Sequence, residues 1–491
     1  MPPRHKRGEG VSVPDYMNKT IRPISACTTG WTVCIACLTF VAPAFAENLQ
    51  SVVQRALETN PELGAIRFNR QAIDQELRAA RGLHLPTVDL RVDQGRVRSY
   101  NKTAVGIVKE SDWHGQRDAS AVLSQRLFDG FEATHEVARH KNRVESARWR
   151  VTDTANSIAL RSVQAYLEVL RAYSVLAAAK TNLSQLQSIN ERVRSRVSGG
   201  KGNGAEESEA GARVASGRAI LAESEGRARD AEALFRAVVG GPPIKLGPVT
   251  VPHRALPRTV ETAVAEAKDA APSVLATQFD ATAAGAAVGG AYSRLYPKLN
   301  LEVSGERGLG ISEADDRSNE ARAMLVVRWN LFNGGNDRAR IDEARSRALE
   351  ATEISHNTQR IIERETRVSW TAMTTAGVRV PAFKRQLELN RATRATYRDQ
   401  YDAGQRRLLD LLEIQNEVFV TESSLRTEEL VGQYNAFRVL ASIGRLVPAL
   451  GLELPGEATI PHEQRFYDRW LTKVHTHRDW NTDVQASTGT K

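Results

Sequence analysis

The chain has 491 residues and a formal net charge of +9, with 67 basic against 58 acidic side chains. Its 18 prolines and its 25% of charged residues of both signs are not the composition of a disordered or collagen-like chain. Beyond residue 46, no stretch approaches the ~18–20 uncharged apolar residues of a membrane-spanning helix, which excludes a polytopic helical membrane protein. There, 62 basic and 56 acidic residues are spread along the sequence, so nucleic acid is not indicated as a partner.

The first 46 residues have the order of a secretory signal. A short basic segment after Met17 precedes an apolar run around Trp31 to Val41, and Ala44-Phe45-Ala46 forms a small-x-small cleavage site. We therefore predict that residues 1–46 are a signal peptide, with Met17 as an alternative start.

All three cysteines fall in this segment, at Cys27, Cys34 and Cys37. The mature chain then has neither disulfides nor cysteine-ligated zinc. A lipoprotein signal ending at Cys37 and a buried helix are the alternatives to a cleaved signal.

Landmarks in the first half of the remaining chain recur in the second half. Residues 85–88 (Leu-Pro-Thr-Val) match residues 296–299 (Tyr-Pro-Lys-Leu), an offset of 211. Residues 127–130 (Leu-Phe-Asp-Gly) match residues 331–334 (Leu-Phe-Asn-Gly), an offset of 204 that holds for the rest of each copy. A repeat of this length indicates two copies of one structural unit.

The duplication divides the chain into five predicted segments. They are the signal peptide 1–46, a first repeat 48–247, a Pro-rich linker 248–257, a second repeat 258–451 and a C-terminal tail 452–491. Each repeat reads as helix, strand, strand, helix and helix.

Alternating apolar and polar residues predict two strands in each copy, each with one apolar and one wet face. The segments are 88–92 and 119–127 in the first copy, and 299–303 and 323–331 in the second. A sandwich or a hairpin packed on a globular core would explain the alternation. About ten residues per strand, with aromatics near the ends, equally suit a membrane barrel. Four strands cannot close a barrel, so several chains would have to contribute.

Long helical patterns follow the strands. The segment 131–197 keeps apolar residues at a strict seven-residue step, and residues 411–446 keep the same step in the second copy. Such a stripe is typical of helices packed in coiled-coil fashion, and 131–197 would extend roughly 100 Å. A plain two-chain coiled coil is the alternative, and it leaves the strands unexplained. Pro381, with Gly377, predicts a kink or a break in the long helix of the second copy.

Three strings resemble the TolC family of outer-membrane export channels. They are residues 60–62 (Asn-Pro-Glu), 329–335 (Trp-Asn-Leu-Phe-Asn-Gly-Gly) and 401–413 (Tyr-Asp-Ala-Gly-Gln-Arg-Arg-Leu-Leu-Asp-Leu-Leu-Glu). The third is similar to members that serve type I protein secretion, including the agglutination-protein group. With the duplicated plan, the resemblance covers about residues 48–451.

The resemblance implies a mostly α-helical chain with four β-strands that works as a homotrimer. Three chains would form a 12-stranded barrel in the lipid of the outer membrane, continued by a long α-helical barrel in the periplasm. The polar loops 93–117 and 305–319 would face the outside, and the tail 452–491 would lie in the periplasm.

The resemblance also implies a periplasmic entrance that is closed at the turns between the paired long helices. By position, Tyr401 and Arg406 would link helices or chains. Asp410 and Glu413 would line a narrow throat, and they lie three residues apart, on one helical face. A symmetric assembly turns each carboxylate into a ring of like charge, whereas solvated surface acids are the alternative. The repeat places two further acids equivalently, Glu206 and Glu209.

The first-copy turn departs from the second in sequence. Gly199 to Gly204 lacks phosphate-loop spacing and predicts a loosened helix–helix turn.

No catalytic, cofactor or metal site is predicted, and we expect no enzyme activity. His462-Glu463 and His475-x-His477 lie in the tail without carboxylate or cysteine partners at metal-ligand spacing.

The predicted function is the outer-membrane exit duct of a three-part export machine. The implied partners are a periplasmic adaptor protein and an inner-membrane ABC transporter, with a protein such as an adhesin or toxin as cargo. One alternative is the outer-membrane part of a small-molecule efflux pump, driven by a proton-coupled pump. A second alternative is a secreted structural coiled-coil protein.

Overall fold

The computed structural model describes residues 47–459, apart from residues 99, 103–107, 111–112 and 310–316. The predicted signal peptide and both histidine motifs of the tail lie outside the described residues.

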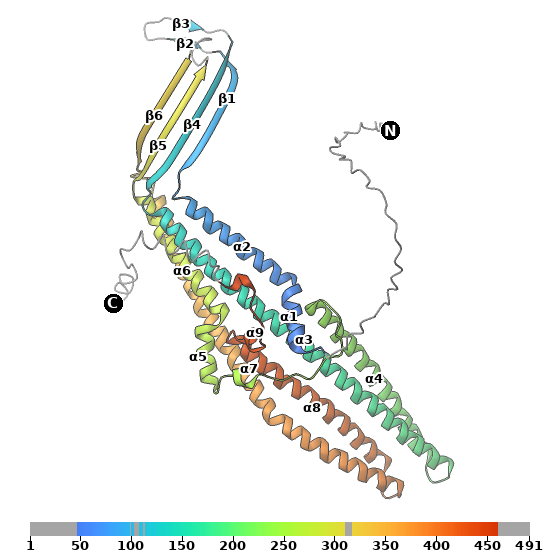
Figure 1. The fold of residues 1–491 in the computed structure, drawn as a ribbon. Helices are drawn as coiled ribbons and strands as arrows, with labels where there is room; N and C mark the ends of the chain where they lie inside the picture. The colour runs from blue at the N-terminus through green and yellow to red at the C-terminus, as the bar shows by residue number, and fades with distance from the viewer. Residues whose placement is uncertain (1–46, 99, 103–107, 111–112, 310–316, 460–491) are drawn as a thin grey trace, which may run out of the picture. The chain divides into compact units, whose positions relative to one another are not determined.

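The two halves of the chain have the same order of elements (Figure 1). The first half contains α1 (Leu49–Thr59), α2 (Pro61–Gly82), β1 (Thr87–Val97), β4 (His114–Phe128), α3 (Glu132–Ser198) and α4 (Gly204–Val239). The second contains α5 (Val260–Ala270), α6 (Pro272–Tyr292), β5 (Lys298–Leu309), β6 (Arg317–Arg328), α7 (Asn336–Asp402) and α8 (Leu408–Ser442), followed by α9 (Leu446–Ala449). The expected fold, mostly helical with four long strands, is confirmed. The boundaries of the two repeats stay a prediction.

Short elements complete the described chain. A ribbon of β2 (Tyr100–Lys102) and β3 (Val108–Glu110) between β1 and β4 was not predicted. Three 3₁₀ turns are η1 (His253–Ala255), η2 (Ser293–Leu295) and η3 (Gly456–Ala458).

Proline separates the two short helices in each half. Pro61 and Pro272 occupy the first turns of α2 and α6, where a missing backbone N–H costs nothing. Asn60 also caps α2, since its Oδ1 accepts a hydrogen bond from the Glu62 N–H at 2.9 Å. The equivalent Ala271 has no side-chain cap.

The four long strands form one antiparallel sheet in the order β1-β4-β5-β6. Residues directly opposite one another share a face, and one such row is Val88, Leu123, Val303 and Ala323. The apolar face is therefore continuous across all four strands. Its side chains stay in contact with solvent: Val88 is 70% exposed and Val327 is 63% exposed.

The opposite face of the sheet is polar. Its rows include Asp89, Val122, Ser304 and Arg322. The outer edges of β1 and β6 have no partner strand among the described residues. The sheet thus exposes one apolar face and two open edges.

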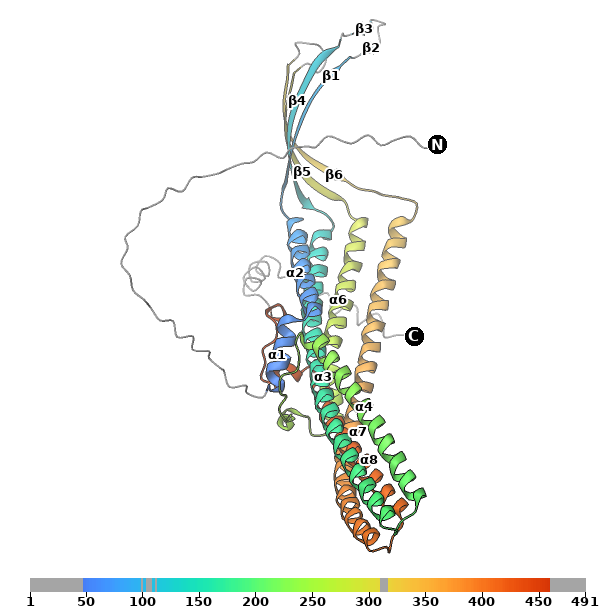
Figure 2. The same cartoon turned by 90° about the vertical axis from the view of Figure 1, so that its right-hand side faces the viewer.

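The long helices lie side by side in two connected arrangements (Figures 1 and 2). Next to the sheet, α3 packs between α2 and α6, and α6 packs against α7. Away from the sheet, α3 packs between α4 and α8, and α8 packs against α7. The orders are therefore α2-α3-α6-α7 and α4-α3-α8-α7, with α7 at one edge of both.

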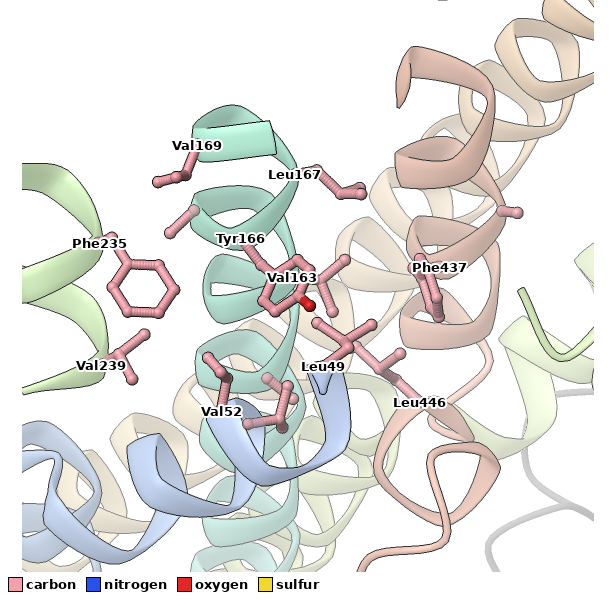
Figure 3. Packing of buried hydrophobic residues seen from close by; sticks show 14 of the residues in the cluster. Leu49, Val52, Val163, Tyr166, Leu167, Val169, Phe235, Val239, Phe437 and Leu446 are labelled. Atoms are coloured by element: carbon pink, nitrogen blue, oxygen red, sulfur yellow. The ribbon is translucent and has the colours of Figure 1, made fainter. Parts of the chain in front are cut away.

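The largest buried cluster lies where α1, α9 and the linker pack on α3 (Figure 3). Tyr166 of α3 is fully buried there, and its hydroxyl lies 2.8 Å from the carbonyl oxygens of both Glu47 and Gly247. Glu47 also pairs with Leu246 in a parallel β-bridge. Through these contacts, Tyr166 fixes both Glu47 and Gly247, which lies at the end of the first copy, to α3.

The two longest helices differ in burial. α3 and α7 each have 67 residues, but 25 are buried in α3 and seven in α7. A seven-residue stripe on α7 stays exposed: Ile354 (52%), Ile361 (40%), Val368 (52%) and Leu389 (50%). We call these four residues the α7 stripe. At the 204 offset α3 has polar residues instead: Arg150, Ser157, Gln164 and Gln185.

Pro381 does not break the second long helix. α7 continues through it without interruption, so a break is not found. Val380 and Phe383 on either side pack with Leu387, Val418 and Leu425 of the α7–α8 pair, so both flanks of the proline are packed in the α7–α8 pair.

Within the described residues, no helix is both long enough and apolar enough to cross a membrane.

Candidate functional site

The candidate site lies at the two turns that join α3 to α4 and α7 to α8. Each turn contains a glycine with positive φ, Gly200 (+73°) and Gly404 (+76°). In each turn, the glycine N–H donates a hydrogen bond to the carbonyl oxygen three residues earlier, at 3.0 Å for Gly200 and 2.9 Å for Gly404. The N–H of the residue after the glycine donates to the carbonyl oxygen five residues before that residue, at 2.8 Å in both turns. This is the hydrogen-bond pair of a Schellman cap.

The expected loosening of the first-copy turn is therefore not found at its start. Gly200 provides the left-handed residue that Gly404 provides in the other copy, and both helices end in the same way. The turns differ where the next helix begins. Asn203 Oδ1 accepts from the Glu206 N–H at 2.9 Å, whereas the equivalent Arg407 makes no side-chain cap.

Tyr401 links the two hairpins within one chain. Its side chain is 2% exposed and packs with Leu408, Leu411 and Leu412. The guanidinium of Arg196 on α3 lies 4.7 Å from the Tyr401 ring centre, and its Nη1 donates to the Tyr401 carbonyl oxygen at 2.5 Å. The aromatic ring and the backbone thus hold the same cation.

The environment of Tyr401 disfavours its ionised form. Burial is the main cause of its raised pKa, and the negative charge of Glu206 raises the pKa further. The Tyr401 hydroxyl has no hydrogen-bond partner among the described residues.

A second link lies beside the first. Arg192 Nη1 of α3 contacts Asp402 Oδ2 of α7 at 3.0 Å. These residues line a hollow of about 680 Å³ between the two helix ends, together with Arg196 and Lys201. Because the Arg192–Asp402 pair is exposed to water, it stabilises the contact by only about 0.2–1 kcal/mol.

Arg406 stays within its own hairpin. Its guanidinium lies 3.9 Å from the Tyr397 ring centre, and its Nε donates to Gln400 Oε1 at 3.1 Å. Two arginines bind Asp410: Arg406 at 3.5 Å and Arg407 at 3.0 Å. Asp410 is thus held at the start of α8 by two cations.

The other three predicted acids are less constrained. Glu413 is exposed, and Glu206 and Glu209 are half-exposed. None of the three forms an ion pair with a described residue. The site therefore brings Tyr401 near Glu206, and Arg406 onto Asp410, but it leaves Glu413 and Glu209 free to face another chain or the solvent.

Arg192, Arg196 and Asp402 were missed by the sequence reasoning. Their contacts join residues 205 and 210 positions apart, and no local pattern marks them. In the described part of the chain, no group of three His, Cys, Asp or Glu residues could hold a metal ion.

Comparison with known proteins supports one family. The sequence model of the family described as "Outer membrane efflux protein" matches residues 52–241 and 263–433. The chain is 24% identical over 430 residues to the outer membrane efflux protein BepC of Brucella suis biovar 1 (strain 1330), covering 87% of this chain and 92% of that protein. It is 22% identical over 417 residues to the outer membrane protein TolC of Salmonella enteritidis, covering 82% of each.

The fold is similar to a solved channel. The crystal structure of the CmeC outer membrane channel of Campylobacter jejuni superposes with a TM-score of 0.72 at 15% identity, covering 86% of this chain and 89% of that one. At this identity the likeness concerns the fold.

Proposed function

Because the chain belongs to the outer membrane efflux protein family, we propose that three copies of it form a passive, gated exit duct. The expected family and its outer-membrane location are confirmed. Members of this family are export channels and not enzymes.

The open sheet is the observation that carries the proposal. Three antiparallel steps separate β1 from β6, so the two edge strands run in opposite directions. β6 of one copy can therefore pair antiparallel with β1 of the next. In lipid every unpaired backbone group costs several kcal/mol, so the ring of strands has to close. The apolar face would then contact lipid and the polar face would line the lumen.

Three copies suit a channel better than two. Two copies would give about eight strands, and side chains fill the interior of a barrel of that size. Three copies give about twelve strands, which leave room for a lumen.

The α7 stripe supports the same assembly. α7 lies at one edge of both helix orders, with α2 or α4 at the other edge. In a closed ring, the exposed stripe of one copy would meet α2 of the next copy near the sheet and α4 near the turns. The helices would then continue the barrel into the periplasm.

We propose that the helix turns form the gate. Asp410 and Glu413, with Glu206 and Glu209, would form acidic rings around the axis. Tyr401 and Arg406 would hold the turns in place through the contacts described above. Opening would require the two hairpins to separate. The Arg192–Asp402 ion pair, which is exposed to water, and the contacts of Arg196 with Tyr401 would then break.

The cargo is proposed from the string at residues 401–413. Its similarity to type I secretion members supports the export of a protein such as an adhesin or toxin. A periplasmic adaptor would bind the helix tips, and an inner-membrane ABC transporter would supply the energy.

Small-molecule efflux with a proton-driven pump is the second candidate, and the printed name of BepC as an efflux protein favours it. Deletion of the gene distinguishes the two. Loss of one large protein from the culture supernatant supports secretion. Unchanged secretion together with raised drug sensitivity supports efflux.

Introduced cysteines test the trimer directly, because the chain has no cysteine beyond residue 46. Leu90→Cys in β1 is combined with single cysteines at positions 321, 323, 325 and 327 in β6, all on the same face. At least one pair is expected to give covalent trimers in outer-membrane fractions. Leu90→Cys with Ala121→Cys, which lie opposite each other in one chain, is the control and should give monomers only. Products that end at two chains, or none, would contradict the trimer.

Conductance in planar bilayers tests the gate. Asp410→Asn and Glu413→Gln are expected to weaken block by divalent cations, and Arg406→Gln is expected to raise single-channel conductance. If conductance and block stay unchanged in all three variants, the gate assignment is wrong.

A further inference from the structure

A hollow of about 510 Å³ lies where the linker between the two copies meets the end of α8. Its lining comes from η1, the residues before α5, the first turns of α5, and the segment from Arg445 into α9. The size lies within the ~300–1,000 Å³ of small-ligand sites. Nothing in the gate or the sheet uses this hollow.

The hollow has a net positive charge. Arg445 Nη1 pairs with Glu266 Oε2 at 3.1 Å. Glu266 is the single acid among the described residues that line the hollow. Arg254 and Arg258 also line it, and neither forms an ion pair with a described residue. Two guanidinium groups are therefore available to an anion, beside an apolar floor that includes Leu256 and Pro448.

The backbone on both sides of the hollow is fixed by local contacts. Gly444 has a φ of +72°, and its N–H and that of Arg445 cap α8 with bonds of 2.9 and 2.8 Å. A Cβ at Gly444 would lie 2.8 Å from the Pro272 Cδ, so only glycine fits this turn. On the other side, Val251 is buried in the main cluster and anchors the linker. The backbone of the hollow is therefore preformed, and Arg254 and Arg258 are exposed side chains at its rim.

The position of the hollow limits what can reach it. The 21 residues of α6 separate it from the sheet by about 32 Å, and the 35 residues of α8 separate it from the helix turns by about 52 Å. Lipid headgroups extend only ~5–8 Å beyond the hydrocarbon core, so they do not reach it. A partner at the helix turns lies many Debye lengths away.

The hollow belongs to the layer that packs on one face of the long helices. α1, α9 and the linker share one buried cluster against α3. In the proposed duct this layer is outside, because the lumen has to stay open. The hollow then faces the middle of the periplasm.

We propose that this hollow binds a carboxylate of a peptidoglycan stem peptide and so anchors the duct in the cell wall. The inference rests on the proposed function for its orientation. The stem peptides are short, carry free carboxylates and are fixed in the periplasm between the membranes. Arg254 and Arg258 would bind a carboxylate by charge-assisted hydrogen bonds, with the peptide over the apolar floor.

Co-sedimentation with purified peptidoglycan sacculi tests the proposal, using the full detergent-purified protein. Arg254→Gln with Arg258→Gln is expected to lower the sedimented fraction about tenfold, and added salt to weaken the binding of the unmodified protein. Arg213→Gln with Arg218→Gln is the matched control, because it removes the same charge from exposed positions on α4 and should bind normally. Arg254→Lys with Arg258→Lys should retain most binding.

The proposal is overturned if the Arg254→Gln/Arg258→Gln variant and the Arg213→Gln/Arg218→Gln control sediment to the same extent, whether both bind sacculi or both fail to bind. A periplasmic protein that is retained through Arg254 and Arg258 while sacculi are not would also overturn it, in favour of a protein ligand. Conductance of the same Arg254/Arg258 variant in bilayers separates the two claims. If the variant conducts but no longer binds sacculi, both the duct and the sacculus-binding site are supported. If the unmodified protein conducts but does not bind sacculi, only the binding site is contradicted.

Discussion

The helices α3 and α7 have the same length and the same place in their copies, yet they relate to the rest of the chain differently. α3 is covered by α1, α2, α4, α6, α8 and α9, whereas α7 lies at the edge and contacts α5, α6 and α8. α3 carries polar residues at each position of the α7 stripe, so the exposed apolar stripe belongs to α7 and not to α3. One copy thus provides the interior of the single chain, and the other leaves an apolar stripe exposed, where we propose that a neighbouring copy binds.

The comparison is tested most strongly at Tyr166. Tyr166→Ala empties a fully buried site and leaves the carbonyls of Glu47 and Gly247 without their hydroxyl partner. We expect a loss of about 3–5 kcal/mol in the free energy of unfolding. Trp370→Ala, at the equivalent half-buried position of α7, should cost clearly less. Thermal unfolding in detergent measures the stability of both variants. Equal losses would contradict the proposed difference in burial between α3 and α7.

A charge in the α7 stripe tests the other side of the comparison. Ile361→Asp should leave the chain folded but place an unpaired charge in the proposed contact between copies, at a cost of about 2–5 kcal/mol. Ser157→Asp is its counterpart in α3 and is exposed. The share of heat-resistant trimer on gels should fall for Ile361→Asp and change little for Ser157→Asp. Trimers that survive the first change would show that α7 has no neighbour there.

A smaller effect is expected where the two helices meet at their ends. Arg192→Gln removes the exposed pair with Asp402 and should lower the stability by about 0.2–1 kcal/mol. Arg194→Gln removes an equally exposed pair with Glu207 inside the first hairpin and serves as the control. Only Arg192→Gln should increase the open probability in bilayers, because only its pair joins the two hairpins.

The smallest effect concerns the hydroxyl of Tyr401. Because burial raises the pKa of Tyr401 above its unfolded value of about 10, the neutral form is favoured in the folded chain. Its contribution is complete below pH ~10 and is lost as the pH rises through the folded pKa. Tyr401→Phe should match the unmodified protein near neutral pH, since the hydroxyl has no described partner. Above pH ~10 the Phe variant should be the more stable of the two in denaturant titrations.

Much of the fold was predictable because it depends on short-range periodicity. The heptads of 131–197 predict α3 to within one residue at each end, and the alternation at residues 88–92 predicts β1. β1 continues to Val97 and β4 begins at His114, so both strands extend into the segment 93–117 that was expected to be a loop. The ribbon of β2 and β3 has no comparable pattern, and three-residue strands depend on their partner more than on their own sequence. The continuity of α7 at Pro381 depends on packing against α8, which a helix-breaking rule does not include.

The candidate site was predictable in part, and for a different reason. The glycines and the string at residues 401–413 mark the turn, and Arg406 and Asp410 lie four residues apart within it. Arg192 and Arg196 reach Asp402 and Tyr401 only because α3 and α7 end at the same level. That coincidence follows from helix lengths and from the packing of α3 on α8, and no motif encodes it.

The bridge between Glu47 and Leu246 has a consequence for maturation. If processing follows Ala46, as the sequence predicts, the new amino-terminal residue, Glu47, pairs with Leu246, which is synthesised about 200 residues later. The amino terminus therefore cannot form this bridge until the chain has been exported as far as Leu246. A precursor that keeps its leader would carry that extra chain directly at Tyr166, so removal of the leader and docking of the amino terminus become consecutive events.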